Sequence, residues 1–327
     1  SPAYSYQDLL DQETNEVPEA LRSDTATYLG SEDLDIERWT SRTFHELEVE
    51  KLWSKTWQMA CRESQVSKPG DYFVYDIVNQ SVLITRTETG ELKAHINSCL
   101  HRGRALKRGQ GKNAKELRCP YHGFTWELSG EFRGMPCEWD FAHVKEENFS
   151  LPGLRVETWG GWVFVNFDQD CMPLEEYMGI LPEHFQRWPA ERRYVAMHVE
   201  KVINCNWKAA VEAFIESYHA IHTHPQLMPY QGIDNSQYDV WGDNVSRTIT
   251  TYATINPSHE DQYSEQDSLD SMLGVEGEPE KDNVVEGRFS ARHRFAELNY
   301  EAYSEMNGVD LKSFATEAEV MDSILYL

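Results

Sequence analysis

The chain has 327 residues, of which 55 are acidic and 30 basic, so its formal net charge is −25. This charge repels nucleic acid and anionic membrane surfaces, and we expect neither as a partner. No run of about 18 apolar residues occurs, and the first residues, from Ser1 to Tyr4, lack the basic and apolar regions of a secretion signal. We therefore expect a cytoplasmic protein with no membrane segment.

Apolar spacing and turn residues predict the elements of the first half of the chain. Short helices are expected at residues 6–11 and 44–57, the second from apolar residues at helical spacing. Residues 70–167 contain short β runs broken by Gly and Asn, which are typical of a compact antiparallel domain of about 100 residues. The runs lie at 72–75, 82–84, 124–126 and 161–167, with turns at Asn79 and Gly90.

The second half of the chain has a mixed pattern. We expect helices at residues 174–188 and 206–223, and strands at 194–203 and 243–254. Residues 256–287 are acidic and contain Gly and Pro, so a loop or mobile lid is predicted there. The last part, 291–327, is predicted to be mostly helical.

Two segments of the β-rich region each pair one cysteine with one histidine. They are Cys99-Leu100-His101-Arg102-Gly103 and Cys119-Pro120-Tyr121-His122-Gly123, with 17 residues between His101 and Cys119. Two facing loops of this kind supply two thiolates to one iron and two imidazoles to another, as in a Rieske [2Fe–2S] cluster. A structural zinc site built from the same four side chains is the alternative, although zinc sites usually begin with two closely spaced cysteines.

A second group of metal-binding residue types lies in the predicted helix at 206–223. Glu212, Glu216 and His219 are spaced to share one helix face, whereas His224 lies about 140° round the helix from His219. Pro225 pushes the residue before it out of the helical region, so a break near Thr223 would bring His224 back toward His219. Two imidazoles and a carboxylate suit dioxygen activation at Fe(II).

Alternatives remain open at this second group. His222 is a candidate ligand in place of His224, or a surface residue. Glu212 is either an outer partner of the site or a solvated helix charge. The spacing Glu216-x₂-His219-x₄-His224 is therefore a candidate iron motif whose third protein ligand is unassigned.

Both motifs resemble those of ring-hydroxylating Rieske oxygenase large subunits. The match is close at residues 99–103 and 119–126, and the likeness extends over roughly residues 40–230. The resemblance implies cluster ligands Cys99, His101, Cys119 and His122 and iron ligands His219 and His224. It also implies that the acid at Glu216, more often Asp, bridges electrons from a neighbouring subunit's cluster.

The resemblance further implies an α+β fold, in which a β-rich Rieske domain is inserted in a helix-grip-like catalytic domain with an antiparallel sheet. We expect an N-terminal helical segment at 1–45 packing on the catalytic domain, the Rieske domain at 46–168 and the catalytic domain at 169–327. The family's third iron ligand is a downstream acid. The nearest late acid is Asp322, which lacks the surrounding motif, and we expect the C-terminal part of the catalytic domain to be absent.

The implied function is hydroxylation of an aromatic or related organic substrate with O₂, by mono- or dioxygenation. No G-x-G-x-x-G follows a predicted strand, so NAD(P)H electrons would come through a separate reductase or ferredoxin. The net charge would then serve solubility or steer a basic patch on that donor. The family suggests a trimer, with or without a small β subunit. The rival functions are a Rieske electron carrier without oxygenase activity and a zinc-stabilised binding protein.

Overall fold

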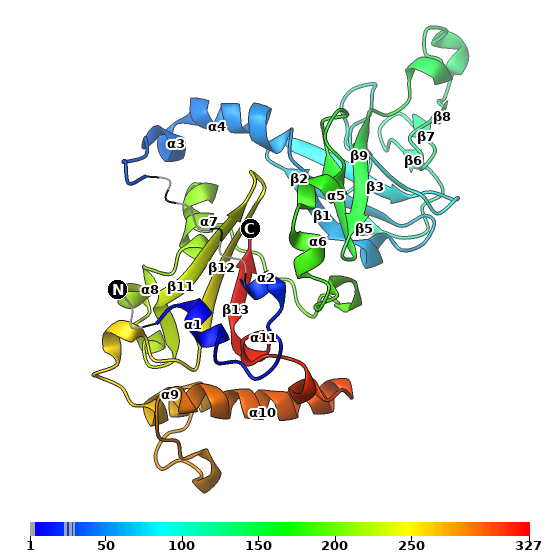
Figure 1. The fold of residues 1–327 in the computed structure, drawn as a ribbon. Coiled ribbons are helices and arrows are strands. Elements are labelled where there is room, and N and C mark those ends of the chain that lie inside the picture. The colour runs from blue at the N-terminus through cyan, green and yellow to red at the C-terminus, as the bar shows by residue number, and fades with distance from the viewer. Residues whose placement is uncertain (1–3, 23–24, 26–27, 29) are drawn as a thin grey trace. The chain divides into compact units, whose positions relative to one another are not determined.

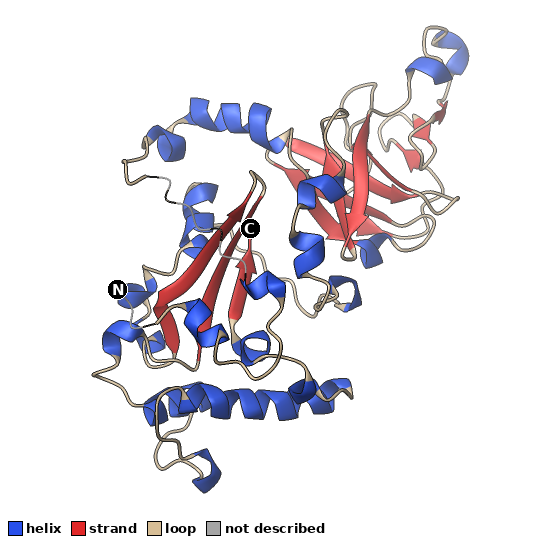
Figure 2. Ribbon diagram, viewed as in Figure 1, coloured by secondary structure: helices blue, strands red, loops and turns tan. Residues whose placement is uncertain are grey.

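The computed structural model describes residues 4–22, 25, 28 and 30–327, apart from the side chain of Glu146. These residues form two compact units, each of which draws on separate stretches of the chain. One unit, which we call the cluster unit, comprises Asp35–Met178 and Phe185–Lys201. The other, the helix–sheet unit, comprises Ser1–Leu34, Gly179–His184 and Val202–Leu327. Figure 2 shows strands in both units.

The cluster unit is built on a seven-stranded sheet in which every neighbouring pair is antiparallel. The order is β1-β10-β9-β4-β3-β2-β5, and a second sheet has the order β6-β7-β8. Its strands are β1 (Gln58–Arg62), β2 (Tyr72–Ile77), β3 (Gln80–Arg86), β4 (Leu92–Ile96), β5 (Gln110–Gly111), β6 (Leu117–Arg118), β7 (Thr125–Trp126), β8 (Phe132–Gly134), β9 (Gly153–Trp159) and β10 (Trp162–Asn166). The predicted antiparallel β runs are confirmed.

Two buried clusters form the interior of this unit. One packs Val82, Ile84, Val163 and Val165 between strands of the large sheet. The other is rich in aromatic residues and includes Phe124, Trp126 and Phe132 beside Cys99 and Cys119. The helical elements of the unit are α3 (Glu37–Thr40), α4 (Arg42–Glu48), η1 (Val49–Trp53), η2 (Glu63–Val66), η3 (Glu138–Asp140), η4 (Glu146–Asn148), α5 (Leu174–Met178) and η5 (Ala190–Arg192).

The helix–sheet unit has a three-stranded antiparallel sheet in the order β11-β12-β13. Its strands are β11 (Gln231–Trp241), β12 (Val245–Tyr252) and β13 (Ser323–Tyr326). The helices are α1 (Tyr6–Leu10), α2 (Glu19–Arg22), α6 (Leu181–His184), α7 (Trp207–Ile215), α8 (Ala220–Thr223), η6 (Pro225–Leu227), η7 (Pro257–His259), α9 (Glu265–Leu273), η8 (Lys281–Asn283), α10 (Ser290–Asn307), η9 (Leu311–Ser313) and α11 (Glu317–Met321). Figure 1 shows α9 and α10 beside each other at one end of this sheet. Residues Tyr6, Leu10, Leu21, Ile249 and Ala318 pack α1 and α2 against β12 and α11.

Several predicted elements are confirmed in the second half of the chain and several are wrong. The strand expected at 243–254 is β12, and most of 291–327 is helical, although it ends in β13. The helix expected at 174–188 is two short helices, α5 and α6, separated at Gly179, whose φ of +53° interrupts a helix. Residues 256–287 were predicted as a loop but contain α9, which begins with a capping box between Ser264 and Asp267.

The strand predicted at residues 194–203 is not formed among the described residues. The segment has no partner strand there, and its apolar side chains are exposed, including Tyr194 at 85% and Val202 at 94%. A strand depends on ladder hydrogen bonds to a neighbour, so alternating apolar residues are insufficient to form one. The longest strand of this unit, β11, was not predicted because polar residues such as Asn235 and Gln237 interrupt its apolar pattern.

Within the described part of the chain, no helix combines the length and apolar character needed to cross a bilayer.

Candidate metal centres

The two Cys-x-His segments form loops with the same backbone hydrogen bonds. In the loop between β4 and β5, Cys99 N donates to Arg104 O at 2.8 Å, and Gly103 N donates to Cys99 O at 2.8 Å. The loop between β6 and β7 has the same pattern, from Cys119 N to Phe124 O at 2.8 Å and from Gly123 N to Cys119 O at 3.1 Å. The two loops therefore present their cysteine and histidine in the same local geometry.

A glycine in the left-handed region closes each loop. The φ angles are +73° at Gly103 and +76° at Gly123, where an L-residue with a Cβ is strained. At Gly123 a Cβ would also lie 3.2 Å from the Pro136 ring, whereas at Gly103 the nearest atom, Ser98 Oγ, lies 3.9 Å away. The glycines noted in the sequence are thus required by the turn itself.

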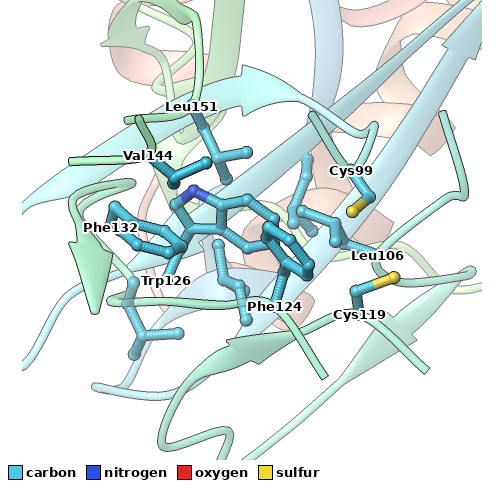
Figure 3. Close-up of a cluster of buried hydrophobic side chains, with 11 residues drawn as sticks. Cys99, Leu106, Cys119, Phe124, Trp126, Phe132, Val144 and Leu151 are labelled. Carbon is cyan, nitrogen blue, oxygen red and sulfur yellow. The ribbon is translucent and has the colours of Figure 1, made fainter. Parts of the chain in front are cut away.

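The four predicted cluster ligands lie together, with the sulfurs inside and the imidazoles outside. Cys99 and Cys119 are 3% and 2% exposed, and Figure 3 shows both sulfurs at one edge of the buried aromatic cluster. His101 and His122 are exposed, and their Nδ1 atoms lie 3.1 Å apart. Two imidazole nitrogens bound to one metal at about 2.1 Å lie roughly 3 Å apart, so this spacing fits a shared metal.

Neighbouring groups change the pKa of the Cys99 thiol and hold the His101 ring in place. Burial raises the pKa of the Cys99 thiol and the Cys119 thiol beside it raises the pKa further, whereas backbone N–H groups of His101 and Arg102 lower it. A thiolate at Cys99 therefore calls for a bound cation. The His101 ring stacks on Phe124 at 5.0 Å between ring centroids.

The candidate ligands occur in pairs. Among the residues described, no set of three or more His, Cys, Asp or Glu side chains is placed to hold a single metal ion. A [2Fe–2S] cluster asks for only two protein ligands on each iron, because sulfides fill the remaining positions. Two thiols beside two imidazoles match that requirement.

The second predicted site lies where α7 ends and α8 begins, and here the continuous helix predicted at 206–223 is wrong. α7 starts after the cap residue Asn206 and ends at Ile215, and Glu216 is extended with φ −133° and ψ 144°. Ser217 N donates to the Tyr238 hydroxyl at 3.0 Å, and the Thr248 hydroxyl donates to the carbonyl of Ile215 at 3.1 Å. These contacts from β11 and β12 hold the chain away from helical geometry.

The break places Glu216 against His219 in a way that a continuous helix would not. Glu216 Oε1 lies 2.6 Å from His219 Nδ1, and Oε2 accepts a hydrogen bond from His219 N at 3.1 Å. A carboxylate on Nδ1 makes that nitrogen the protonated one and leaves Nε2 as the lone-pair donor to a metal. Glu216 therefore orients His219 within the same chain.

His224 approaches His219 as expected from Pro225. α8 ends at Thr223, and His224 follows with φ −132° and ψ 53°, outside the helical region. The His219 and His224 ring centroids lie 5.6 Å apart. His222 is exposed on α8, and Glu212 is half-buried one turn before the break.

Asp322, the late acid noted in the sequence, has other partners. Its carboxylate contacts both terminal nitrogens of Arg292 at 2.7 and 2.9 Å and accepts from Tyr252 N at 3.0 Å. The Asp322 side chain is 0% exposed. Its carboxylate is thus occupied by a structural ion pair.

Sequence reasoning missed the residues that shape the second site. Tyr238 and Thr248 lie 21 and 33 residues from their partners, on strands without a local motif. The capping of α7 by Asn206, by contrast, follows the usual preference for Asn before a helix.

Comparison with known proteins matches both halves of the chain to one class of enzyme. Residues 56–146 match the Rieske [2Fe-2S] domain, and residues 183–290 match the ring hydroxylating alpha subunit catalytic domain. The chain is 32% identical over 193 residues to the biphenyl 2,3-dioxygenase subunit alpha of Rhodococcus jostii strain RHA1. It is also 32% identical over 201 residues to the carnitine monooxygenase oxygenase subunit of Acinetobacter pittii strain PHEA-2.

These alignments cover 57% of this chain in each case, 42% of the biphenyl enzyme subunit and 51% of the carnitine enzyme subunit. The chain thus matches about half or less of these relatives' length. Among solved structures, the quaternary ammonium Rieske monooxygenase CntA superposes with a TM-score of 0.60 at 25% identity, over 68% of this chain and 66% of that one. The expected fold, a Rieske β domain with an α+β catalytic domain, is confirmed.

Proposed function

From the premise that this chain belongs to the Rieske ring-hydroxylating oxygenases, we propose that it is the terminal oxygenase component of a multi-protein system. It would use O₂ and electrons from a separate reductase or ferredoxin to hydroxylate an aromatic or related organic substrate. The observation that carries the proposal is the presence in one chain of two Cys–His loops and of the Glu216, His219 and His224 group.

The residues have distinct roles in this proposal. Cys99 and Cys119 would hold one cluster iron as thiolates, and His101 and His122 would hold the other through Nδ1. When bound, the cluster supplies single electrons and the mononuclear iron activates dioxygen.

His219 and His224 would bind the mononuclear iron, and Glu216 fixes the tautomer of His219. We also propose Glu216 as the bridge by which electrons reach this site from the cluster of an adjacent protomer. The third protein ligand is left unassigned.

Assembly and domain limits are part of the same proposal. We propose an N-terminal segment at 1–45, a Rieske domain at 46–168 and a catalytic domain at 169–327. A bridge between protomers requires a ring, so we propose a homotrimer, with or without a small β subunit, working in the cytoplasm with electrons from NAD(P)H.

The substrate class would be identified by a screen of two groups of compounds, one for each kind of relative. The relatives' names include a biphenyl dioxygenase and a carnitine monooxygenase, so aromatic hydrocarbons and quaternary ammonium compounds form the two arms of the screen. Cis-dihydroxylation and monooxygenation would be separated by the oxygen content of the product.

The deciding experiment measures iron and acid-labile sulfide per chain, with visible and EPR spectra, on anaerobically purified protein. About three irons to two sulfides, with a Rieske-type reduced signal, would support the oxygenase. About two irons to two sulfides, unchanged by added Fe(II), would favour the alternative of an electron carrier without oxygenase activity. Zinc without sulfide would overturn both.

A further inference from the structure

Two residues that stand opposite each other on neighbouring strands hold the backbone on both sides of Glu216. Tyr238 of β11 pairs with Thr248 of β12 in the antiparallel ladder. The Thr248 hydroxyl donates to the carbonyl of Ile215, the residue before Glu216, at 3.1 Å. The Tyr238 hydroxyl accepts from the N–H of Ser217, the residue after Glu216, at 3.0 Å. We call this cross-strand pair, Tyr238 and Thr248, the strand clamp.

The strand clamp replaces two backbone hydrogen bonds of a continuous helix. In such a helix the N–H of Ser217 would donate to the carbonyl of Ala213. The carbonyl of Ile215 would likewise accept from the N–H of His219. Because side-chain hydroxyls bind the Ser217 N–H and the Ile215 carbonyl, the helix can end there with both groups satisfied. The N–H of His219 is thereby released and donates to Glu216 Oε2 at 3.1 Å.

A further hydroxyl from the sheet holds Ser217. Its Oγ lies 2.6 Å from the Tyr238 hydroxyl oxygen and donates to Ser236 Oγ at 2.9 Å. Ser236 lies in a bulge of β11, where residues 233–236 stand opposite the single residue Thr250 of β12. Bulges bend a strand and re-aim its side chains, and they are frequent beside active sites. The bulge thus adds a second anchor for the residue that follows Glu216.

The bulge is itself fixed by buried polar contacts. A Cβ on Gly232, at its start, would lie 2.3 Å from both Asn235 Oδ1 and Thr251 Oγ1, so the chain is closely packed there. Asp234 N donates to Asn256 Oδ1 at 2.9 Å, and Asn256 Nδ2 donates to Asp234 Oδ2 at 3.2 Å. Positioning a site accurately requires supporting residues that are locked by packing and hydrogen bonds in this way.

We propose that the strand clamp positions Glu216 and thereby sets the affinity of the mononuclear site for Fe(II). The inference rests on the proposed function and adds residues that act on the metal through Glu216 alone. The carboxylate reaches Nδ1 and the N–H of His219 only where the helix is broken. Without the clamp hydroxyls, residues 215–219 would return toward helical hydrogen bonding, and the carboxylate would move away from Nδ1. Tyr238 and Thr248 are therefore positioning residues and not ligands.

The test is a titration with Fe(II) of the cluster-loaded chain from which mononuclear iron has been removed. Tyr238→Phe and Thr248→Val each delete a hydroxyl and keep the shape of the side chain. Each should weaken Fe(II) binding by about 3- to 10-fold, less than the roughly 10- to 100-fold typical of a direct partner of a ligand. The visible spectrum of the cluster should be unchanged. Thr248→Ser keeps the hydroxyl and should restore the affinity to within about twofold of the wild type.

A double-mutant cycle distinguishes positioning from a general loss of structure. If the clamp acts through Glu216, adding Tyr238→Phe to Glu216→Gln should change Fe(II) affinity by less than about twofold further. An equal loss in both backgrounds would overturn the proposal. The matched control is Tyr300→Phe, which deletes a buried hydroxyl that donates to Ala315 O at 2.8 Å in the same unit. It should leave Fe(II) affinity unchanged, and a loss as large as that in Tyr238→Phe would also overturn the proposal.

Failure of the proposed function gives a different result from failure of this inference. A wild-type chain that binds no Fe(II), or that binds it equally well as His219→Ala, would overturn the proposed iron site and the strand clamp with it. Fe(II) binding that depends on His219 but is the same in Tyr238→Phe, Thr248→Val and the wild type would overturn the positioning role alone.

Discussion

Glu216 shows how one side chain can decide the chemistry of another. Its two oxygens contact Nδ1 and the backbone N–H of His219, three residues further along the chain. The contact fixes both the position of the imidazole and the nitrogen that carries its proton. The carboxylate is 43% exposed, so the value of this contact lies in orientation and not in the strength of a buried ion pair.

Replacing Glu216 by Gln should weaken Fe(II) binding by about 10- to 100-fold, because the amide cannot hold the Nδ1 proton as a carboxylate does. The visible spectrum of the cluster should be unchanged. Titration of the protein lacking mononuclear iron with Fe(II) measures the effect. Glu305→Gln, on the exposed side of α10, is the control, and equal affinities in both variants would argue against a positioning role.

The two candidate metal centres should be separable by single substitutions. His219→Ala should keep the cluster spectrum but lose mononuclear iron and oxygen insertion, since only one of the two sites loses a ligand. Cys119→Ala should lose the cluster, whereas Cys205→Ala, at an exposed position, should keep it. An active His219→Ala protein would contradict the assignment of this site.

At the scale of elements, the two cluster loops share their hydrogen bonds although their sequences differ between cysteine and glycine. Each loop turns back so that the residue four positions after the cysteine donates to its carbonyl. The turn requires a positive φ, which explains a glycine at both positions. Their surroundings differ, however, because only Gly123 lies close to a ring, that of Pro136.

Alanine at these two glycines should therefore have unequal effects. Gly103→Ala should cost about 1–2 kcal/mol in the free energy of unfolding, from backbone strain alone. Gly123→Ala should cost more and should reduce cluster content, because the new methyl also crowds Pro136. Denaturant unfolding with parallel spectra makes the comparison, and Gly153→Ala, in open extended backbone, is the control. The reverse order of costs would refute the steric explanation.

At the scale of the whole molecule, each compact unit contains one of the two candidate centres. The Cys99 and Cys119 thiols of the cluster unit are almost fully buried, whereas His219 has 34% of its side chain exposed and His224 is exposed. Solvent therefore reaches His219 and His224 more easily than it reaches the two thiols.

We expect a chelator to remove the mononuclear iron before it affects the cluster. Incubation with EDTA should lower iron by about one per chain while the visible spectrum persists. Iron analysis after desalting, with spectra at each time, measures the order of loss. If the visible absorption of the cluster were lost together with the first iron, the order of loss expected from the difference in burial would be wrong.

Each unit also buries one histidine that makes the folded state less stable in acid. Burial lowers the pKa of His95 to about 4, and burial together with the Arg247 charge lowers the pKa of His184 to about 4. Both are neutral when folded and take up a proton near pH 6.5 when unfolded, so stability is lost as the pH falls from about 6.5 to 4.

The slope contributed by one such histidine is at most about 1.4 kcal/mol per pH unit. His184→Gln should flatten the fall in the helix–sheet unit, whereas His198→Gln, at an exposed position, should leave it unchanged. Urea unfolding at pH 7, 6 and 5 tests this. An unchanged slope in His184→Gln would show that other groups control the acid transition.

Local spacing was sufficient to predict the features that depend on neighbours along the chain. The two matching Cys–His loops, their loop glycines, the short antiparallel strands and the approach of His224 before Pro225 all follow from residues a few positions apart. Tertiary structure decided what depends on distant partners. Tyr238 and Thr248 break the predicted helix at Glu216, Arg292 occupies Asp322, and residues 194–203 form no strand among the described residues because a strand needs a hydrogen-bonded neighbour.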